Sequence, residues 1–164
     1  MSASNAASLR RGFCSLVFGL VAAVAAGPSF AQTLDQQAKC GSEAERAFTR
    51  QGYITDGVTR SATDPNGDYA LMAVYQSHYN PQLNRCFMLL KTTGAGHKNV
   101  GDENDFLVDA NENRIYAEYT WIPQEGKKYW EVPPVDCQLM PSLTEKTECH
   151  SEGEFMAFVA RYME

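Results

Sequence analysis

Two apolar runs near the middle of the chain dominate its hydrophobic pattern. The first spans residues 69–79 and the second residues 85–90, and a short segment rich in asparagine and proline, residues 80–84, separates them. Both runs are rich in aromatic and aliphatic residues and contain almost no charge. Such runs on either side of a short turn predict a β-hairpin, and the lack of charge predicts that both faces of both runs are covered.

The chain after the hairpin shows the alternation that is typical of strands. Strands are predicted at residues 106–108, 114–122 and 127–132, and a short edge strand at residues 135–140. Within the second of these strands, one face is predicted to consist of Ile115, Ala117, Tyr119 and Trp121. Consecutive strands that are joined by short turns predict an antiparallel meander.

Two polar stretches predict loops. Residues 53–68 are rich in turn formers, and a short extended piece is expected at residues 53–58. Residues 92–104 contain several glycines and few apolar anchors. This second stretch is expected to be the most mobile part of the chain.

Helical periodicity appears on either side of the predicted strands. Residues 33–51 predict one helix, which Gly52 ends and in which the sulfur of Cys40 is expected to point at the sheet. Its rough apolar stripe consists of Leu34, Ala38, Ala44, Ala47 and Phe48.

The second helix is predicted after Ser151. Ser151 and Glu154 have the spacing of a capping box. The apolar face that follows consists of Phe155, Phe158, Val159 and Tyr162. Because so short a helix is marginal alone, it is expected to dock on the sheet. Helices at the two ends of a run of strands predict an α+β fold, with about five antiparallel strands in a meander and the N- and C-terminal helices packed on them.

The first residues have the features of a secretory signal peptide. Arg10 and Arg11 precede an apolar stretch of about 15 residues, which is shorter than the roughly 20 residues that a membrane-spanning helix needs. Small residues at positions 29 and 31 fit a cleavage site. The sequence therefore predicts a signal peptide at residues 1–31, one exported domain at residues 32–164, and no stable membrane insertion after cleavage.

The charge of the predicted domain limits its partners. The whole chain has 14 basic and 20 acidic residues, and removal of Arg10 and Arg11 lowers its formal net charge from −6 to −8. An acidic domain has no electrostatic reason to bind nucleic acid or an anionic membrane surface. The charge favours solubility, or a basic partner.

The cysteine count agrees with export to the periplasm or the outside of the cell. Cys14 lies in the predicted signal peptide, and the other four are Cys40, Cys86, Cys137 and Cys149. An even number of cysteines in a small exported domain predicts disulfides, and four cysteines allow three pairings.

The positions of the predicted elements favour one of these pairings, Cys40–Cys86 with Cys137–Cys149. Cys137 follows the end of a predicted strand, and Cys149 precedes the helix cap, so the chain between them can turn back. Cys40 on the first helix then meets Cys86 on the central strand. Both bonds are interpreted as structural, not as redox centres.

The sequence predicts no catalytic constellation, no metal site and no cofactor. The histidines show no metal-ligand spacing, and no Cys-x-x-Cys motif occurs. A Cys–His nucleophile would need Cys86 or Cys149 to be a free thiol. Two functions stay open: a non-catalytic periplasmic binding or envelope-associated module, which we favour, and a small periplasmic hydrolase that uses His78 or His97 with nearby carboxylates.

Aromatic residues supply the remaining signal for function. Eight of them fall on predicted strands: Tyr69, Tyr75, Tyr79, Tyr116, Tyr119, Trp121, Tyr129 and Trp130. They are typical of a sheet core, or of a sheet face that binds a protein or a small apolar ligand.

Several short motifs resemble those of a group of small secreted proteins of Gram-negative bacteria that have no assigned activity. The motifs are residues 78–80 with 84–87, residues 127–132, the two cysteines that follow, and Glu154-Phe155. The resemblance covers most of the predicted domain. It implies export and a shared fold, and it assigns no catalytic residue.

Overall fold

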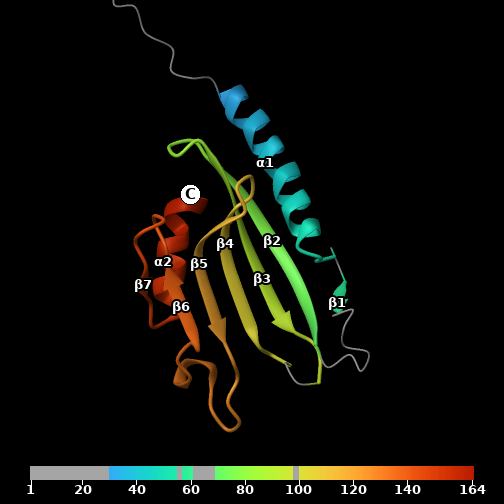
Figure 1. The fold of residues 1–164 in the computed structure, drawn as a ribbon, viewed down its shortest axis with the longest axis vertical. Coiled ribbons are helices and arrows are strands. Elements are labelled where there is room, and N and C mark those ends of the chain that lie inside the picture. Colours follow the sequence, from blue (N-terminus) through green and yellow to red (C-terminus); the bar gives the residue numbers. More distant parts are fainter. Residues whose placement is uncertain (1–29, 55–56, 61–68, 98–99) are drawn as a thin grey trace, which may run out of the picture.

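The computed structural model describes residues 30–54, 57–60, 69–97 and 100–164. These residues form an α+β fold with a seven-stranded antiparallel sheet, in which the strands lie side by side in chain order (Figure 1). In chain order the elements are α1 (Phe30–Arg50), β1 (Val58–Arg60), β2 (Ala70–Asn80), β3 (Arg85–Gly94), β4 (Glu103–Asp109), β5 (Arg114–Trp121), the 3₁₀ helix η1 (Tyr129–Glu131), β6 (Asp136–Leu139), β7 (Thr147–Glu148) and α2 (Glu152–Met163). The predicted meander and its two helices are confirmed, although the sheet has more strands than the expected five or so.

The predicted hairpin is formed by β2 and β3. Their pairing runs from Leu71 opposite Gly94 to Asn80 opposite Arg85. In the turn, the side-chain oxygen of Asn80 accepts a hydrogen bond from the backbone N–H of Leu83. Asn84 adopts a φ of 51°, in the left-handed region that asparagine tolerates better than most residues. The asparagines therefore fix the turn locally.

The predicted loop at residues 92–104 is shorter than expected. β3 continues to Gly94 and β4 begins at Glu103, because Thr92 and Thr93 extend the β2–β3 and β3–β4 pairing. The backbone N–H of Gly94 donates to the carbonyl of Asp102 and closes the remaining connection. Residues 98 and 99 lie outside the described residues, and the predicted mobility of this loop stays a prediction.

The two short edge strands were not predicted as such. β1 overlaps the extended piece expected at residues 53–58 only at Val58. β7 contains two residues, Thr147 and Glu148, and pairs with the end of β6. Strands this short carry too few residues for a recognisable alternation.

One core lies between α1 and the sheet. Cys40, Ala44, Ala47 and Phe48 are the buried residues of the helix, and the sheet contributes Ala73, Cys86, Met88, Leu90, Val108 and Ala110. Leu34 is 72% exposed, because the first turns of α1 extend past the end of the sheet (Figure 1). The predicted apolar stripe is thus buried only in its second half. Gly52 has a φ of 87° directly after the helix, as expected for a C-terminal stop.

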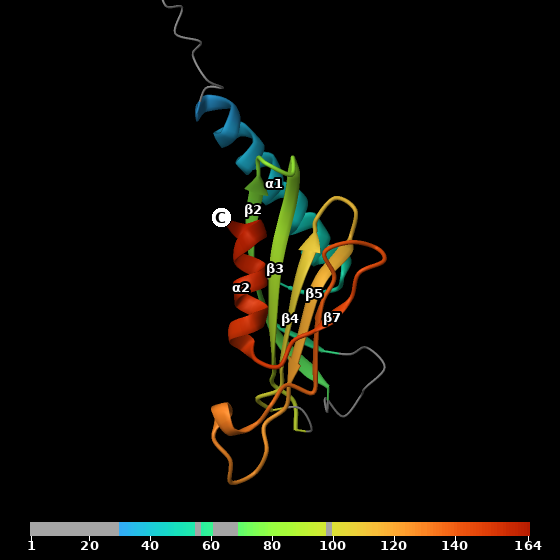
Figure 2. The ribbon, with the colours of Figure 1, turned by 90° about the vertical axis from the view of Figure 1, so that its left-hand side faces the viewer.

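A second core lies on the opposite face, under α2. Figure 2 shows the sheet nearly edge-on, with α2 along one side of the strands. The predicted apolar face of α2 is confirmed, since its four residues Phe155, Phe158, Val159 and Tyr162 are all buried. Ser151 caps the helix by accepting a hydrogen bond from the backbone N–H of Glu154. The carboxylate of Glu154 reaches back to the backbone N–H of His150, one residue before the predicted partner.

A register shift changes the predicted faces of β5. Ala117 pairs with Leu107 but Ile115 pairs with Val108, so Tyr116 is an extra residue, as in a β-bulge. Tyr116 is buried under α2, whereas Ile115 is 40% exposed on the other face. The prediction that Ile115 shares a face with the later odd-numbered residues of this strand is therefore wrong, because strict alternation does not survive a bulge.

Residues 127–132 do not form the predicted strand. They contain a turn and η1, and the carboxylate of Glu131 accepts a hydrogen bond from the backbone N–H of Lys128. The ring of Tyr129 packs on Trp121 with ring centroids 4.5 Å apart. The alternation of charged and aromatic residues at 127–132 therefore belongs to a compact loop and not to a strand. In this loop the ring of Tyr129 packs against β5.

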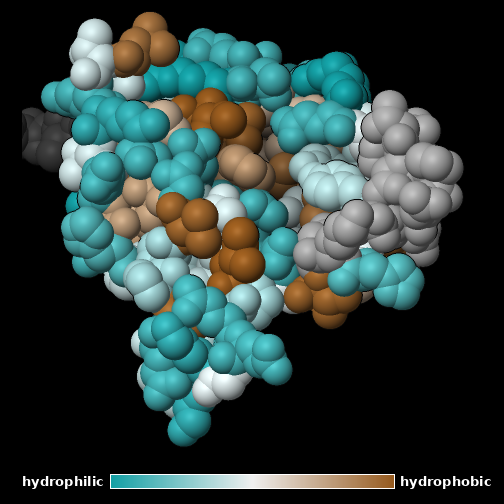
Figure 3. Space-filling view, turned by 60° about the horizontal axis from the view of Figure 1, so that its bottom comes forward, coloured by the Kyte–Doolittle hydropathy of each residue, from teal (hydrophilic) through white to brown (hydrophobic). Residues whose placement is uncertain are grey.

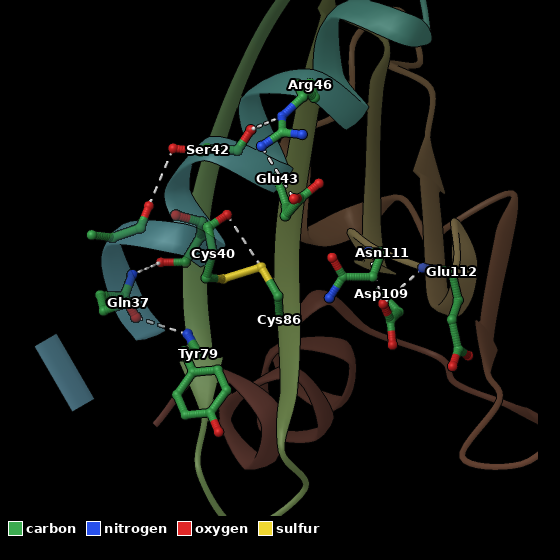
Figure 4. Close-up of a disulfide and its surroundings, with 12 residues drawn as sticks. Gln37, Cys40, Ser42, Glu43, Arg46, Tyr79, Cys86, Asp109, Asn111 and Glu112 are labelled. Atoms are coloured by element: carbon green, nitrogen blue, oxygen red, sulfur yellow. Dashed lines mark hydrogen bonds and ion pairs between the residues drawn. A yellow bond between two sulfur atoms is a disulfide. The ribbon is translucent and has the colours of Figure 1, made fainter. Parts of the chain in front are cut away.

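Both predicted disulfides are present. Cys40–Cys86 joins α1 to β3 (Figure 4), and Cys137–Cys149 joins β6 to the segment before α2. Within the described ranges, no helix is both long enough and apolar enough to cross a membrane. The predicted signal peptide lies outside the described residues, apart from its last two positions, which open α1.

Candidate functional site

The first half of β2 carries apolar side chains that the described helices leave uncovered. Met72 and Val74 are 57% and 65% exposed, and Val58, which pairs directly with Met72, is 36% exposed. In β3, by contrast, every residue from Cys86 to Leu90 is buried. The prediction that both runs of the hairpin are covered on both faces is therefore right for β3 and wrong for β2.

These apolar residues belong to one continuous surface. Two rows of directly paired residues cross the sheet here, Val74–Lys91–Asp105–Tyr119 and Met72–Thr93–Glu103–Trp121. Paired residues of antiparallel strands share a face, and both rows end in the core under α2. We call the uncovered part of this surface the open face, defined by Val58, Met72, Val74, Lys91, Thr93 and Glu103.

A partly buried ion pair joins Lys91 of the open face to Asp105. The ammonium nitrogen of Lys91 is 2.7 Å from a carboxylate oxygen of Asp105, and their side chains are 39% and 8% exposed. Burial raises the pKa of the Asp105 carboxyl, and the bond to Lys91 partly opposes this rise. Lys91 thus favours the charged form of a buried carboxylate while part of its own side chain stays in water.

A hydrogen-bonded group of phenols and carboxylates borders the ion pair. The hydroxyls of Tyr119 and Tyr129 are 3.0 Å apart, and Tyr129 donates to the carboxylate of Glu152 over 3.1 Å. Burial raises the pKa of both tyrosines, and the hydrogen bonds to Tyr119 and Glu152 raise that of Tyr129 further. Burial, followed by the charges of Asp105 and Glu152, raises the pKa of Glu103. The phenols therefore stay protonated at neutral pH and act as hydrogen-bond groups.

The open face offers groups for apolar and ionic contact. The open face combines aliphatic contact with one ion pair and one further carboxylate, and its residues include neither a histidine nor a cysteine. Among the described residues, no group of three or more histidines, cysteines, aspartates and glutamates is arranged to hold a metal ion.

The two histidines of the hydrolase hypothesis lie at opposite ends of the sheet. His78 is near the tip of the hairpin, where it lines a hollow of about 340 Å³ with Glu164, and its Nε2 atom is buried without a hydrogen-bond partner. No ion pair joins His78 to Glu164 among the described residues. His97 is exposed in the turn after β3. The structure thus does not bring the two together, and it places neither on the open face.

The cysteine nucleophile has no support in this structure. Cys86 and Cys149 are both disulfide-bonded, and both are buried.

Gln37 lies one helical turn from Cys40 and forms two hydrogen bonds with β2. Its side-chain oxygen accepts from the backbone N–H of Tyr79, and its side-chain nitrogen donates to the carbonyl of Ser77 (Figure 4). The carboxamide thereby takes the place of a neighbouring strand at the outer edge of β2.

The aromatic residues do not form one exposed face. Tyr116, Tyr119 and Trp121 are buried in the core under α2, whereas Tyr69 and Trp130 are 52% and 76% exposed. Some of their positions on strands were predicted correctly from the sequence. The apolar side chains that the open face exposes, however, are those of valine and methionine.

Further hollows lie elsewhere on the described part of the molecule. One of about 220 Å³ on the α1 side is lined by Gln51, Tyr53, Phe106, Val108, Asn113 and Ile115.

Figure 3 looks toward the end of the sheet where β2 begins and shows hydrophobic residues (brown) at its centre among hydrophilic ones (teal). Exposed apolar residues of the connections at this end are Val100, Ile122 and Val135.

The chain matches no family model, no curated protein and no solved structure, so the candidate site rests on its own geometry. The resemblance to small secreted proteins stays a prediction.

Proposed function

We propose that this chain is a non-catalytic binding module of the periplasm or cell envelope, and that a partner protein docks on the open face. The observation that carries the proposal is the 65% exposure of Val74, in the interior of an 11-residue strand. Contiguous exposed apolar side chains are a typical mark of interaction sites. The surrounding polar groups supply a rim that can form specific hydrogen bonds and ion pairs.

Export is part of this proposal. Two disulfides are typical of proteins from oxidising compartments, and the features of residues 1–31 supply a route to one. Protein that is purified from the periplasm is expected to begin at Gln32, which intact-mass measurement tests. A mass that still includes the first 31 residues would contradict cleavage at this site.

Site-specific photo-crosslinking in intact cells tests the binding face. A photoreactive side chain that replaces Val74 is expected to capture a discrete partner. The matched control replaces Leu143, which is 89% exposed in the connection after β6 and far from the open face in sequence. Equal capture from the two positions, or none from Val74, would overturn the proposal.

A further inference from the structure

Negative charge is in excess at the border of the open face. Three carboxylates gather there, those of Glu103, Asp105 and Glu152, and Lys91 pairs with Asp105. Among the described residues, no cation forms an ion pair with Glu103. Its carboxylate interacts with the hydroxyl of Tyr129 and with the charge of Lys91, and these two groups offset only part of the negative charge of the three carboxylates.

We infer that the open face takes a basic amphipathic protein segment, in which lysine or arginine accompanies apolar side chains. This inference rests on the proposed function and names the chemistry of the partner. Apolar side chains of the segment cover Met72 and Val74, and a cation pairs with Glu103. Because β2 and β4 are separated by one strand, these contacts are roughly 10 Å apart, a distance that one long basic side chain next to an apolar one can span.

Charge argues against the other occupants of the same surface. A second copy of this acidic domain would bring 20 further acidic residues against 12 basic ones, and it would repeat rather than neutralise the charge of Glu103. An anionic membrane surface would be repelled in the same way. A basic segment gains from both the apolar strip and the excess of carboxylates beside it.

The experiment uses the purified full domain with its disulfides intact and two synthetic probes. The first probe is an amphipathic peptide of leucine and lysine, and the second carries glutamate in place of each lysine. The first is expected to bind, and the second is not. Met72→Thr with Val74→Thr places a β-branched residue, which strands favour, at both positions and is expected to weaken binding of the first probe by roughly fivefold or more, since apolar burial is lost.

The decisive comparison is between two substitutions that remove the same charge. Glu103→Gln is expected to weaken binding by roughly threefold to fivefold, as for one partly exposed ion pair, and to reduce its dependence on salt. Glu148→Gln, in the exposed edge strand β7, is expected to leave it unchanged. Circular dichroism of each variant checks that it is folded.

Three results would overturn the inference. Equal weakening by Glu103→Gln and Glu148→Gln would show attraction by net charge alone, and equal binding of both probes would show that the partner needs no cation. Self-association that Val74→Thr abolishes would identify a second copy as the occupant. Suppose that Val74 captures a partner in cells, but that the two glutamate variants weaken binding equally or that the two probes bind equally. The proposed function would then stand, and only the chemistry of the partner would be rejected.

Discussion

Replacement of Lys91 by methionine is expected to cost more stability than its partial exposure suggests. The substitution keeps the apolar stem of the side chain but leaves the carboxylate of Asp105, which is 8% exposed, without its cation 2.7 Å away. Breaking a fully buried pair costs roughly 3–5 kcal/mol, and because Lys91 keeps part of its hydration we expect about 2–3 kcal/mol in the free energy of unfolding. Urea denaturation at neutral pH measures this loss.

The pH dependence identifies the cause of that loss. Burial raises the pKa of Asp105 in the folded protein, so the folded state takes up a proton at a higher pH than the unfolded chain. The contribution of this group to stability therefore rises as pH falls through the folded pKa, and it falls as pH rises. Without Lys91 the pKa is higher still, so the destabilisation is expected to be greatest at neutral pH and to shrink in mild acid.

Two further variants make the test of this ion pair specific. Asp105→Asn added to Lys91→Met removes the buried charge and is expected to recover most of the lost stability. Lys39→Met breaks an exposed pair with Asp35, in which both side chains are more than two thirds in water, and should leave the midpoint of unfolding unchanged. A Lys91→Met variant that is as stable as the wild type, or that weakens further in mild acid, would refute the reasoning.

The cross-links and the helix cap give further expectations for urea denaturation. Alanine at both Cys40 and Cys86 is expected to lower the free energy of unfolding by about 4 kcal/mol, and alanine at both Cys137 and Cys149 by about 3 kcal/mol, because the sequence separations are 46 and 12 residues. The reverse order would contradict the loop-entropy argument. Ser151→Ala removes the cap of α2 and is expected to cost about 1 kcal/mol, and no loss would mean that the cap is dispensable.

Local patterns were enough to predict the frame of this molecule. The hairpin follows from two apolar runs around an asparagine-rich turn, and α2 follows from a cap with apolar residues at helical spacing. The disulfide pairing followed from the short connection between Cys137 and Cys149, which left Cys40 on the first helix for Cys86 on the central strand. Each of these inferences uses neighbours in the chain, or elements that a short connection holds together.

The candidate site could not be predicted in the same way, because it depends on contacts across the sheet. The pairing of Lys91 with Asp105 requires the register of β3 and β4. The bulge at Tyr116 leaves no mark on the alternation of β5. The apolar residues Met72 and Val74 look the same in the sequence whether a helix covers them or not, and only the length and direction of α2 decide their exposure.

The attachment of α2 at both of its ends explains why the open face stays uncovered. At its start, the disulfide to Cys149 and the hydrogen bond between Tyr129 and Glu152 hold the helix beside β5 and β6. At its end, the side-chain amide of Asn80 donates to the backbone carbonyls of Arg161 and Tyr162 and holds it beside the tip of the hairpin. A 12-residue helix fixed at these two places crosses the sheet diagonally and leaves the beginning of β2 and the end of β3 uncovered. The open face is therefore a fixed consequence of the topology, and a partner would meet it already formed.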